Sequence, residues 1–447
     1  MKKSILLGAA ALAAIALSAP QAADAGELKI GGYYQFRAAS MDNTPSDAIG
    51  EETANYWAQR LQLNLDMKAS DKSHAHAIVR ALDSSHVDGA DSTVTAADAQ
   101  AEWVIRQMWL ETEAWGVGLK VGSMPIALND GILVNHDVTS YGSILLSKNF
   151  GGVTVVGANV KVNEGDPTMT VGPAGGNHKD VDLWVLSALG KFNTVDYQVT
   201  GAFMNEESGF VGAGAAPIYG IVGNGTGLKL NGGDNVSDGW LALTLGTNIQ
   251  GIDVTGTAIY ETGMDNVTAG SQLENDGFMF GVRAKGKTGF GGWNAYAMYG
   301  SEDFTAVVPG GDMTFWSPTW DMGGPGSVDL MKSALTGVNN NSVATSQSNI
   351  WGLGAGLSIN AGAWTIKPSL DYAQIVEERV SSNTLVGPVF VKYDSAWGGT
   401  LAFSTKIQEG TTLDLSGSWV DPNSSNLVAG TTEDTLHYLQ ASVKMDF

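Results

Sequence analysis

The chain has 447 residues, of which 16% are charged, 58 are glycine and none is cysteine, and its formal net charge is −22 at neutral pH. The missing cysteine excludes disulfides and thiolate metal sites, and the acidic balance disfavours nucleic acid and anionic membrane surfaces as partners. Soluble domains usually contain about 25% charged residues, so this composition favours a chain that places apolar residues in alternation with polar ones.

The first 25 residues have the pattern of a secretory signal peptide. Lys2 and Lys3 supply positive charge, residues 5–17 form an apolar run, and residues 23–25 read Ala-Asp-Ala, a small-x-small cleavage signal. No stretch reaches the length that a transmembrane helix needs. We therefore expect a cleaved segment, 1–25, and one domain, 26–447, that is either soluble after export or crosses a membrane as strands.

Period-two alternation of apolar and polar residues recurs along the mature chain. Leucine or methionine occupies every second position of 61–67, and 412–419 and 439–447 have the same spacing. In a barrel strand this spacing turns one set of side chains to acyl chains and the other to the lumen. Eighteen strands are predicted, with sixteen as an alternative, near 27–39, 55–69, 72–83, 101–113, 116–124, 141–149, 152–163, 181–191, 193–204, 236–248, 251–262, 276–287, 290–301, 349–360, 362–375, 391–407, 409–420 and 435–447.

The connections between these strands alternate between tight turns and long loops. Ser70-Asp71, Gln250-Gly251 and Glu409-Gly410 carry residues typical of tight hairpins. The long loops lie near 40–54, 84–100, 125–140, 164–180, 205–235, 264–275, 302–348, 376–390 and 421–434. This sorting predicts an all-β fold: a transmembrane antiparallel up-and-down β-barrel with short periplasmic turns and long external loops.

Aromatic and charged residues are sorted in the same way. Trp115, Phe150, Phe192, Phe290, Trp293 and Trp364 lie beside tight turns, and Trp57, Trp103, Trp240, Trp351, Trp397 and Trp419 lie near the ends of long loops. Two such groups fit the aromatic belts of a membrane barrel, although ordinary core tryptophans are the alternative. Acidic residues far outnumber basic ones in the long loops, so we expect a neutral wall and an acidic external rim.

The chain also resembles Gram-negative outer-membrane porins. The terminal Phe447, with apolar residues at every second position before it, resembles the C-terminal signature recognised by the barrel assembly machinery. Residues 27–37 and 58–66 look like the first two strands of porins, closest to the homotrimeric porins of sulfate- and metal-reducing bacteria. Residues 121–131 are similar to the strand exit that leads into a pore-constricting loop in those proteins.

This resemblance implies a homotrimer of channels, each narrowed by an inward third loop whose carboxylates face arginines of the wall. Carried onto this chain, the pore-constriction candidates are Arg37, Arg60, Arg80 and Arg106 on the wall and Asp130 and Asp137 on the loop. The alternative is that these arginines neutralise lumen carboxylates such as Asp66.

Other chemistry has little support in the sequence. His74 and His76 could share a strand face, but a third metal ligand is missing, and we find no GxSxG motif or Ser/His/Asp arrangement. We therefore expect neither an enzyme nor a bound cofactor. Ca²⁺ or Mg²⁺ could still bridge acidic external loops to lipopolysaccharide through residues such as Glu51, Glu52, Asp88 and Asp91.

The function that we expect is a porin of the outer membrane, with a water-filled channel for passive diffusion of small hydrophilic solutes and ions and a modest cation preference. Its expected partners are outer-membrane lipid, lipopolysaccharide, the assembly machinery and further copies of the chain, and not nucleic acid. One alternative is a substrate-specific channel for a sugar or an organic acid, with the aromatic loop 302–348 at its mouth. The other is a non-conducting structural barrel of the envelope.

Overall fold

A computed structural model describes the strands, the short turns and a few flanking residues. The described residues are 26–42, 54–88, 104–131, 133–163, 181–206, 236–267, 271–301, 304, 350–376, 395–423 and 435–447. The expected signal peptide, 1–25, and most of the long loops lie outside this set. No helix among the described residues is long and apolar enough to cross a membrane.

The structure confirms eighteen strands. They are β1 (Glu27–Asp42), β2 (Ala54–Ser70), β3 (Ser73–Asp88), β4 (Val104–Ala114), β5 (Val117–Leu128), β6 (Val134–Phe150), β7 (Val153–Asn163), β8 (Val181–Phe192), β9 (Val195–Glu206), β10 (Val236–Ile249), β11 (Ile252–Val267), β12 (Ser271–Thr288), β13 (Gly291–Gly300), β14 (Ile350–Ala361), β15 (Trp364–Ile375), β16 (Ser395–Gln408), β17 (Thr411–Asn423) and β18 (Leu436–Asp446).

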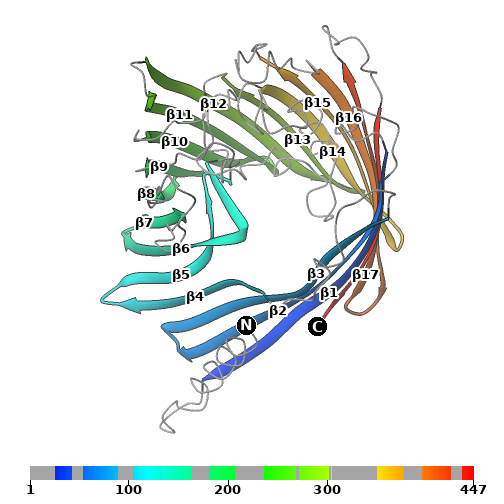
Figure 1. Ribbon diagram of the computed structural model, residues 1–447, viewed down its shortest axis with the longest axis horizontal. Coiled ribbons are helices and arrows are strands. Elements are labelled where there is room, and N and C mark those ends of the chain that lie inside the picture. The colour runs from blue at the N-terminus through cyan, green and yellow to red at the C-terminus, as the bar shows by residue number, and fades with distance from the viewer. Residues whose placement is uncertain are drawn as a thin grey trace, which may run out of the picture.

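Each strand pairs antiparallel with its neighbours in sequence, and β1 also pairs with β18, so the sheet closes into a barrel (Figure 1). The closing seam extends to the last residue, because Gly32 and Phe447 exchange two backbone hydrogen bonds of 3.0 Å. Closure leaves no free sheet edge along this seam, which is what a strand-built membrane protein requires. The predicted all-β, antiparallel up-and-down barrel is therefore confirmed.

Tight turns join the strands at one end of the barrel, called here the turn end, and the other end is called the loop end. Trp115-Gly116 and Gln250-Gly251 both have positive φ at their two residues, as a two-residue hairpin turn of the I′ type requires. The Oδ1 atom of Asn248 accepts a hydrogen bond from Gly251 N at 3.0 Å. The sequence pattern of these turns is thus explained by local backbone geometry.

The outer face of the barrel is apolar and carries aromatic rings toward both ends. On the loop side the rings of Phe278 and Phe280 lie 5.6 and 5.4 Å from Tyr299, and Tyr372 lies 4.6 Å from Trp397. At the turn end Trp115 is almost fully exposed. Trp240 departs from the predicted belts, because it is buried on the lumen side of β10, and Trp103 lies outside the described residues.

Two predicted loops are wrong in their boundaries. Residues 264–275 largely continue β11 and β12 as a long hairpin rather than forming a loop. Residues 125–140 continue β5 and β6, which pair again beyond a register shift between Met124 and Ile126. Alternation alone does not show where a strand leaves the wall, and the second hairpin determines the shape of the lumen.

Candidate pore constriction

The hairpin formed by the ends of β5 and β6 leaves the wall and enters the ring of strands (Figure 1). Gly122 precedes the bend with a φ of +128°, and a Cβ there would lie 2.3 Å from the carbonyl oxygen of Met108. Any side chain at this position would therefore push β5 away from β4. At the tip, Asn129, Asp130 and Gly131 all have positive φ, which reverses the chain within three residues.

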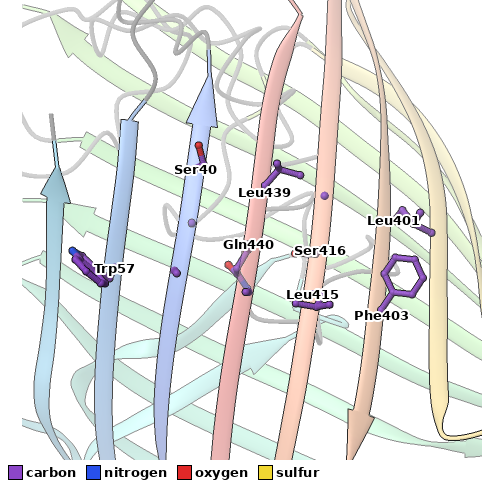
Figure 2. Close-up of a pocket in the computed structure, with 12 residues that line it drawn as sticks. Ser40, Trp57, Leu401, Phe403, Leu415, Ser416, Leu439 and Gln440 are labelled. Atoms are coloured by element: carbon purple, nitrogen blue, oxygen red, sulfur yellow. The ribbon is translucent and has the colours of Figure 1, made fainter.

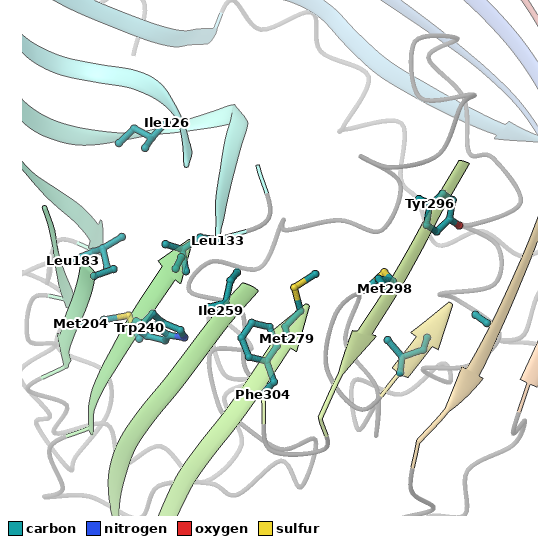
Figure 3. Close-up of a cluster of buried hydrophobic side chains, with 14 of the residues drawn as sticks. Ile126, Leu133, Leu183, Met204, Trp240, Ile259, Met279, Tyr296, Met298 and Phe304 are labelled. Atoms are coloured by element: carbon teal, nitrogen blue, oxygen red, sulfur yellow. The ribbon is translucent and has the colours of Figure 1, made fainter. Parts of the chain in front are cut away.

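Apolar side chains hold the hairpin against the inner wall. Ile126 and Leu133 are 7% and 0% exposed, and they belong to one cluster with Leu183, Met204 and Trp240 of β8, β9 and β10 (Figure 3). Burial of one leucine or isoleucine side chain contributes about 1.5–3 kcal/mol. The apolar part of the inner wall of β8 to β10 is therefore the part that packs against Ile126 and Leu133.

Polar contacts join the tip of the hairpin to the inner wall. The Asn129 backbone N–H donates to Gln198 Oε1 of β9 at 3.3 Å, and its side-chain Nδ2 donates to Thr244 Oγ1 of β10 at 3.2 Å. Asp130 forms an ion pair with Arg283 of β12, with 2.5 Å between Oδ2 and Nη2. The tip thus reaches three wall strands, which keeps the hairpin at one place in the lumen.

The four predicted wall arginines lie on four consecutive strands. Arg37 of β1 faces the lumen, because its neighbour Phe36 faces outward, and Arg60 of β2 pairs in register with Gln35, which lies on the same face of β1 as Arg37. Arg80 of β3 donates from Nε to Gln62 Oε1 at 2.8 Å.

Arg106 lies on β4 at a register shift against β3. It stands beside Gln107, which is buried, and between Ile105 and Met108, which face outward. The structure therefore places all four arginines on one side of the lumen, on β1 to β4.

The predicted loop carboxylates have different outcomes. Asp130 forms its ion pair with Arg283, a residue that sequence reasoning missed. Arg283 follows the alternation of the apolar Phe280 and Val282, so it could have been recognised as facing the lumen. Asp137 lies on β6, and its side chain is outside the described residues. Among the described residues of the hairpin, the exposed ones are Pro125 and Ala127. The constriction role of these residues stays a prediction.

Other lumen carboxylates also have partners within the wall. Tyr296 of β13 donates its hydroxyl to Asp371 Oδ1 of β15 at 3.0 Å, across the intervening β14. Gly354 of β14 permits this contact, because a Cβ there would lie 2.2 Å from the same oxygen. Asp66, the alternative partner of the arginines, contacts Nδ1 of His76.

A ring stack lies in the lumen near the turn end. His76 stacks on Trp109 with 4.7 Å between ring centroids, and His74 lies 6.3 Å from His76. Within the part of the chain that the structure describes, no three His, Cys, Asp or Glu side chains gather as a metal site. The acidic loop residues Glu51, Glu52 and Asp91 and the side chain of Asp88 are outside the described residues, so the loop cation site stays a prediction.

Comparison with known proteins relates the chain to others through its structure alone. No protein-family model matches it, and no curated protein matches it. The barrel is similar to Pseudomonas aeruginosa OccK3 (OpdO), with a TM-score of 0.53, 11% identity and coverage of 94% of this chain and 96% of that one. It is also similar to P. aeruginosa OpdQ, with a TM-score of 0.54, 11% identity and coverage of 94% and 99%.

A BenF-like porin from Pseudomonas fluorescens Pf-5 gives a TM-score of 0.56 at 12% identity, with coverage of 94% of this chain and 98% of that one. Identities this low show a shared fold and carry no information on solute. Nearly full coverage of each chain nevertheless means that the whole barrel is matched. The chain therefore has the fold of Gram-negative outer-membrane porins, an 18-stranded closed barrel.

Proposed function

We propose that the chain forms a water-filled channel for passive diffusion of small hydrophilic solutes and ions across the outer membrane. The observation that carries this proposal is the β5–β6 hairpin, which lies inside a closed barrel and is attached to β8, β9, β10 and β12. A barrel of this size without an inward segment would enclose a wide aqueous channel. A segment attached to one side of the lumen narrows that channel. No enzymatic activity is proposed.

The direct test is single-channel recording in planar bilayers. Stepwise conductance in symmetric KCl supports the proposal. A correctly folded barrel without conductance steps contradicts it and supports a structural role in the envelope instead.

Ion preference separates two versions of the channel. The acidic external rim supports a modest cation preference, because a negative mouth concentrates cations. A second candidate, a channel for organic acids, is favoured by the gathering of Arg37, Arg60, Arg80 and Arg106 on one wall while Asp130 is held by Arg283. A reversal potential of cationic sign in a KCl gradient supports the first. An anionic sign contradicts it, and saturable block by a small carboxylate supports the second.

We further propose assembly as a homotrimer, with subunits in contact near β4 to β7. The inward bend removes β5 and β6 from the wall at the loop side, because described pairing between β4 and β5 starts at Met108↔Ser123, and pairing between β6 and β7 stops at Gly142↔Lys161. The bend leaves a notch in the outer surface between the loop-side ends of β4 and β7. A neighbouring copy would cover this notch.

Cross-linking tests the contact, and a chain without cysteine makes single-cysteine variants unambiguous. Ser123→Cys lies beside the notch, and Ala297→Cys lies on the outer face of β13 as a matched control. Treatment of membranes with a flexible bismaleimide is expected to give dimers with S123C and monomers with A297C. Equal cross-linking of both variants, or dimers with A297C alone, contradicts the proposed face.

A further inference from the structure

The outer face of the barrel has a hollow of about 780 Å³ across β16, β17, β18, β1 and β2. It lies over the seam at which the two ends of the chain close the barrel (Figure 2). Its lining includes Trp57, Leu401, Phe403, Leu415 and Leu439, and no lining side chain is charged.

Small residues create the hollow. Ala38 of β1 pairs in register with Ala441 of β18, so two adjacent outward positions carry only a methyl group. Trp57 stands beside Ala38 on one side, and Leu415 stands beside Ala441 on the other. Gly417 extends the hollow on β17, where a Cβ would lie 3.1 Å from Leu439 Cδ2.

The lining residues show at what height of the barrel wall the hollow lies. Ser40 and Leu439 line it and lie close to the loop ends of β1 and β18, whereas Leu415 and Phe403 lie farther toward the turn end. Trp57 therefore stands at the height of the belt on the loop side, where aromatic rings mark the lipid headgroups. The hollow begins at this belt and descends into the apolar zone of the wall.

We infer that the hollow is a binding site for one hydrocarbon chain of an outer-leaflet lipid, which makes closer contact here than elsewhere on the wall. This inference rests on the proposed placement of the barrel in the outer membrane. In that setting the surroundings of an outward apolar surface are acyl chains, and a flexible chain follows a hollow lined by leucine, phenylalanine and tryptophan. The belt above the hollow places the headgroup at its upper end.

Photolabelling tests the inference on the full chain in phosphatidylethanolamine vesicles that contain a trace of the same lipid with a diazirine in mid-chain. After irradiation, peptide mapping is expected to show several-fold more label on β1, β17 and β18 than on the outer faces of β12 to β14. The double substitution Ala38→Leu with Ala441→Leu fills the hollow and should remove this excess. The control is Ala295→Leu with Ala355→Leu, an outward alanine pair that is also in register, on β13 and β14.

Each outcome is decisive. Even label around the wall, or an excess unchanged by the A38L/A441L pair, overturns the lipid site while leaving the membrane placement intact. Cross-links from these residues to a second copy of the chain would also overturn it, because a protein would then fill the hollow. Label on no outward residue would overturn both the placement and the site, whereas conductance recordings test the channel independently.

Discussion

Replacement of Leu133 by aspartate is expected to release the hairpin from the inner wall and to raise single-channel conductance by roughly a factor of two, because pore width sets ion flow. Leu133 is fully buried against the lumen face of β8 to β10. Burial of an unpaired carboxylate at this position costs several kcal/mol of free energy. This cost is on the order of the free energy that burial of the Ile126 and Leu133 side chains contributes together. Recordings in symmetric KCl measure the change.

The matched control for this variant places the same charge on the exposed side of the same hairpin. Ala127→Asp should not reproduce this rise in conductance, because Ala127 is exposed and its replacement does not detach the hairpin from the wall. The wall strands pair without the hairpin tip, so both variants should keep the shift in gel mobility on heating that folded barrels show. Identical conductance for L133D and the unmodified chain would contradict the attachment of the hairpin to the inner wall through Leu133.

Neutralisation of Asp130 is expected to shift selectivity toward anions. The Asp130 and Arg283 side chains are only 23% and 19% exposed, so Asp130→Asn removes a negative charge from the lumen beside the Arg283 guanidinium. One unit charge at 4 Å changes the energy of a monovalent ion by about 1 kcal/mol even in water, which corresponds to roughly a fivefold change in permeability ratio. The reversal potential in a KCl gradient measures this shift.

The reciprocal variant provides the control for sign. Arg283→Gln should shift the reversal potential toward cations, and the double variant D130N/R283Q should return it close to the original value, because the pair is removed as a unit. Asp71→Asn, at an exposed turn, removes a carboxylate far from the hairpin and should have little effect. Equal shifts from D71N and D130N would show that the ion pair does not line the conducting path.

Much of the fold can be predicted from the sequence, because strand faces and turns are local properties. Alternation in 61–67 and 439–447 places leucines outward, and Gln250-Gly251 has the backbone conformation that a tight turn requires. The prediction weakens in β8, where apolar Leu183 and Val185 alternate with apolar Trp184 and Leu186. Trp184 and Leu186 face outward, and Leu183 and Val185 face the hairpin. A strand that is apolar on both faces shows no alternation of apolar and polar residues.

The sequence by itself determined the eighteen strands, the tight turns and the faces of those strands that alternate, because each depends on residues within a few positions of one another. The tertiary structure alone decided that residues 125–140 continue β5 and β6 as a paired hairpin, that Asp130 meets Arg283, and that Ala38 and Ala441 form one hollow. These contacts join residues far apart in the chain, and they exist only after the sheet has curved and closed. The physical reason is that local patterns report which side of a strand is apolar, whereas closure decides what lies opposite that side.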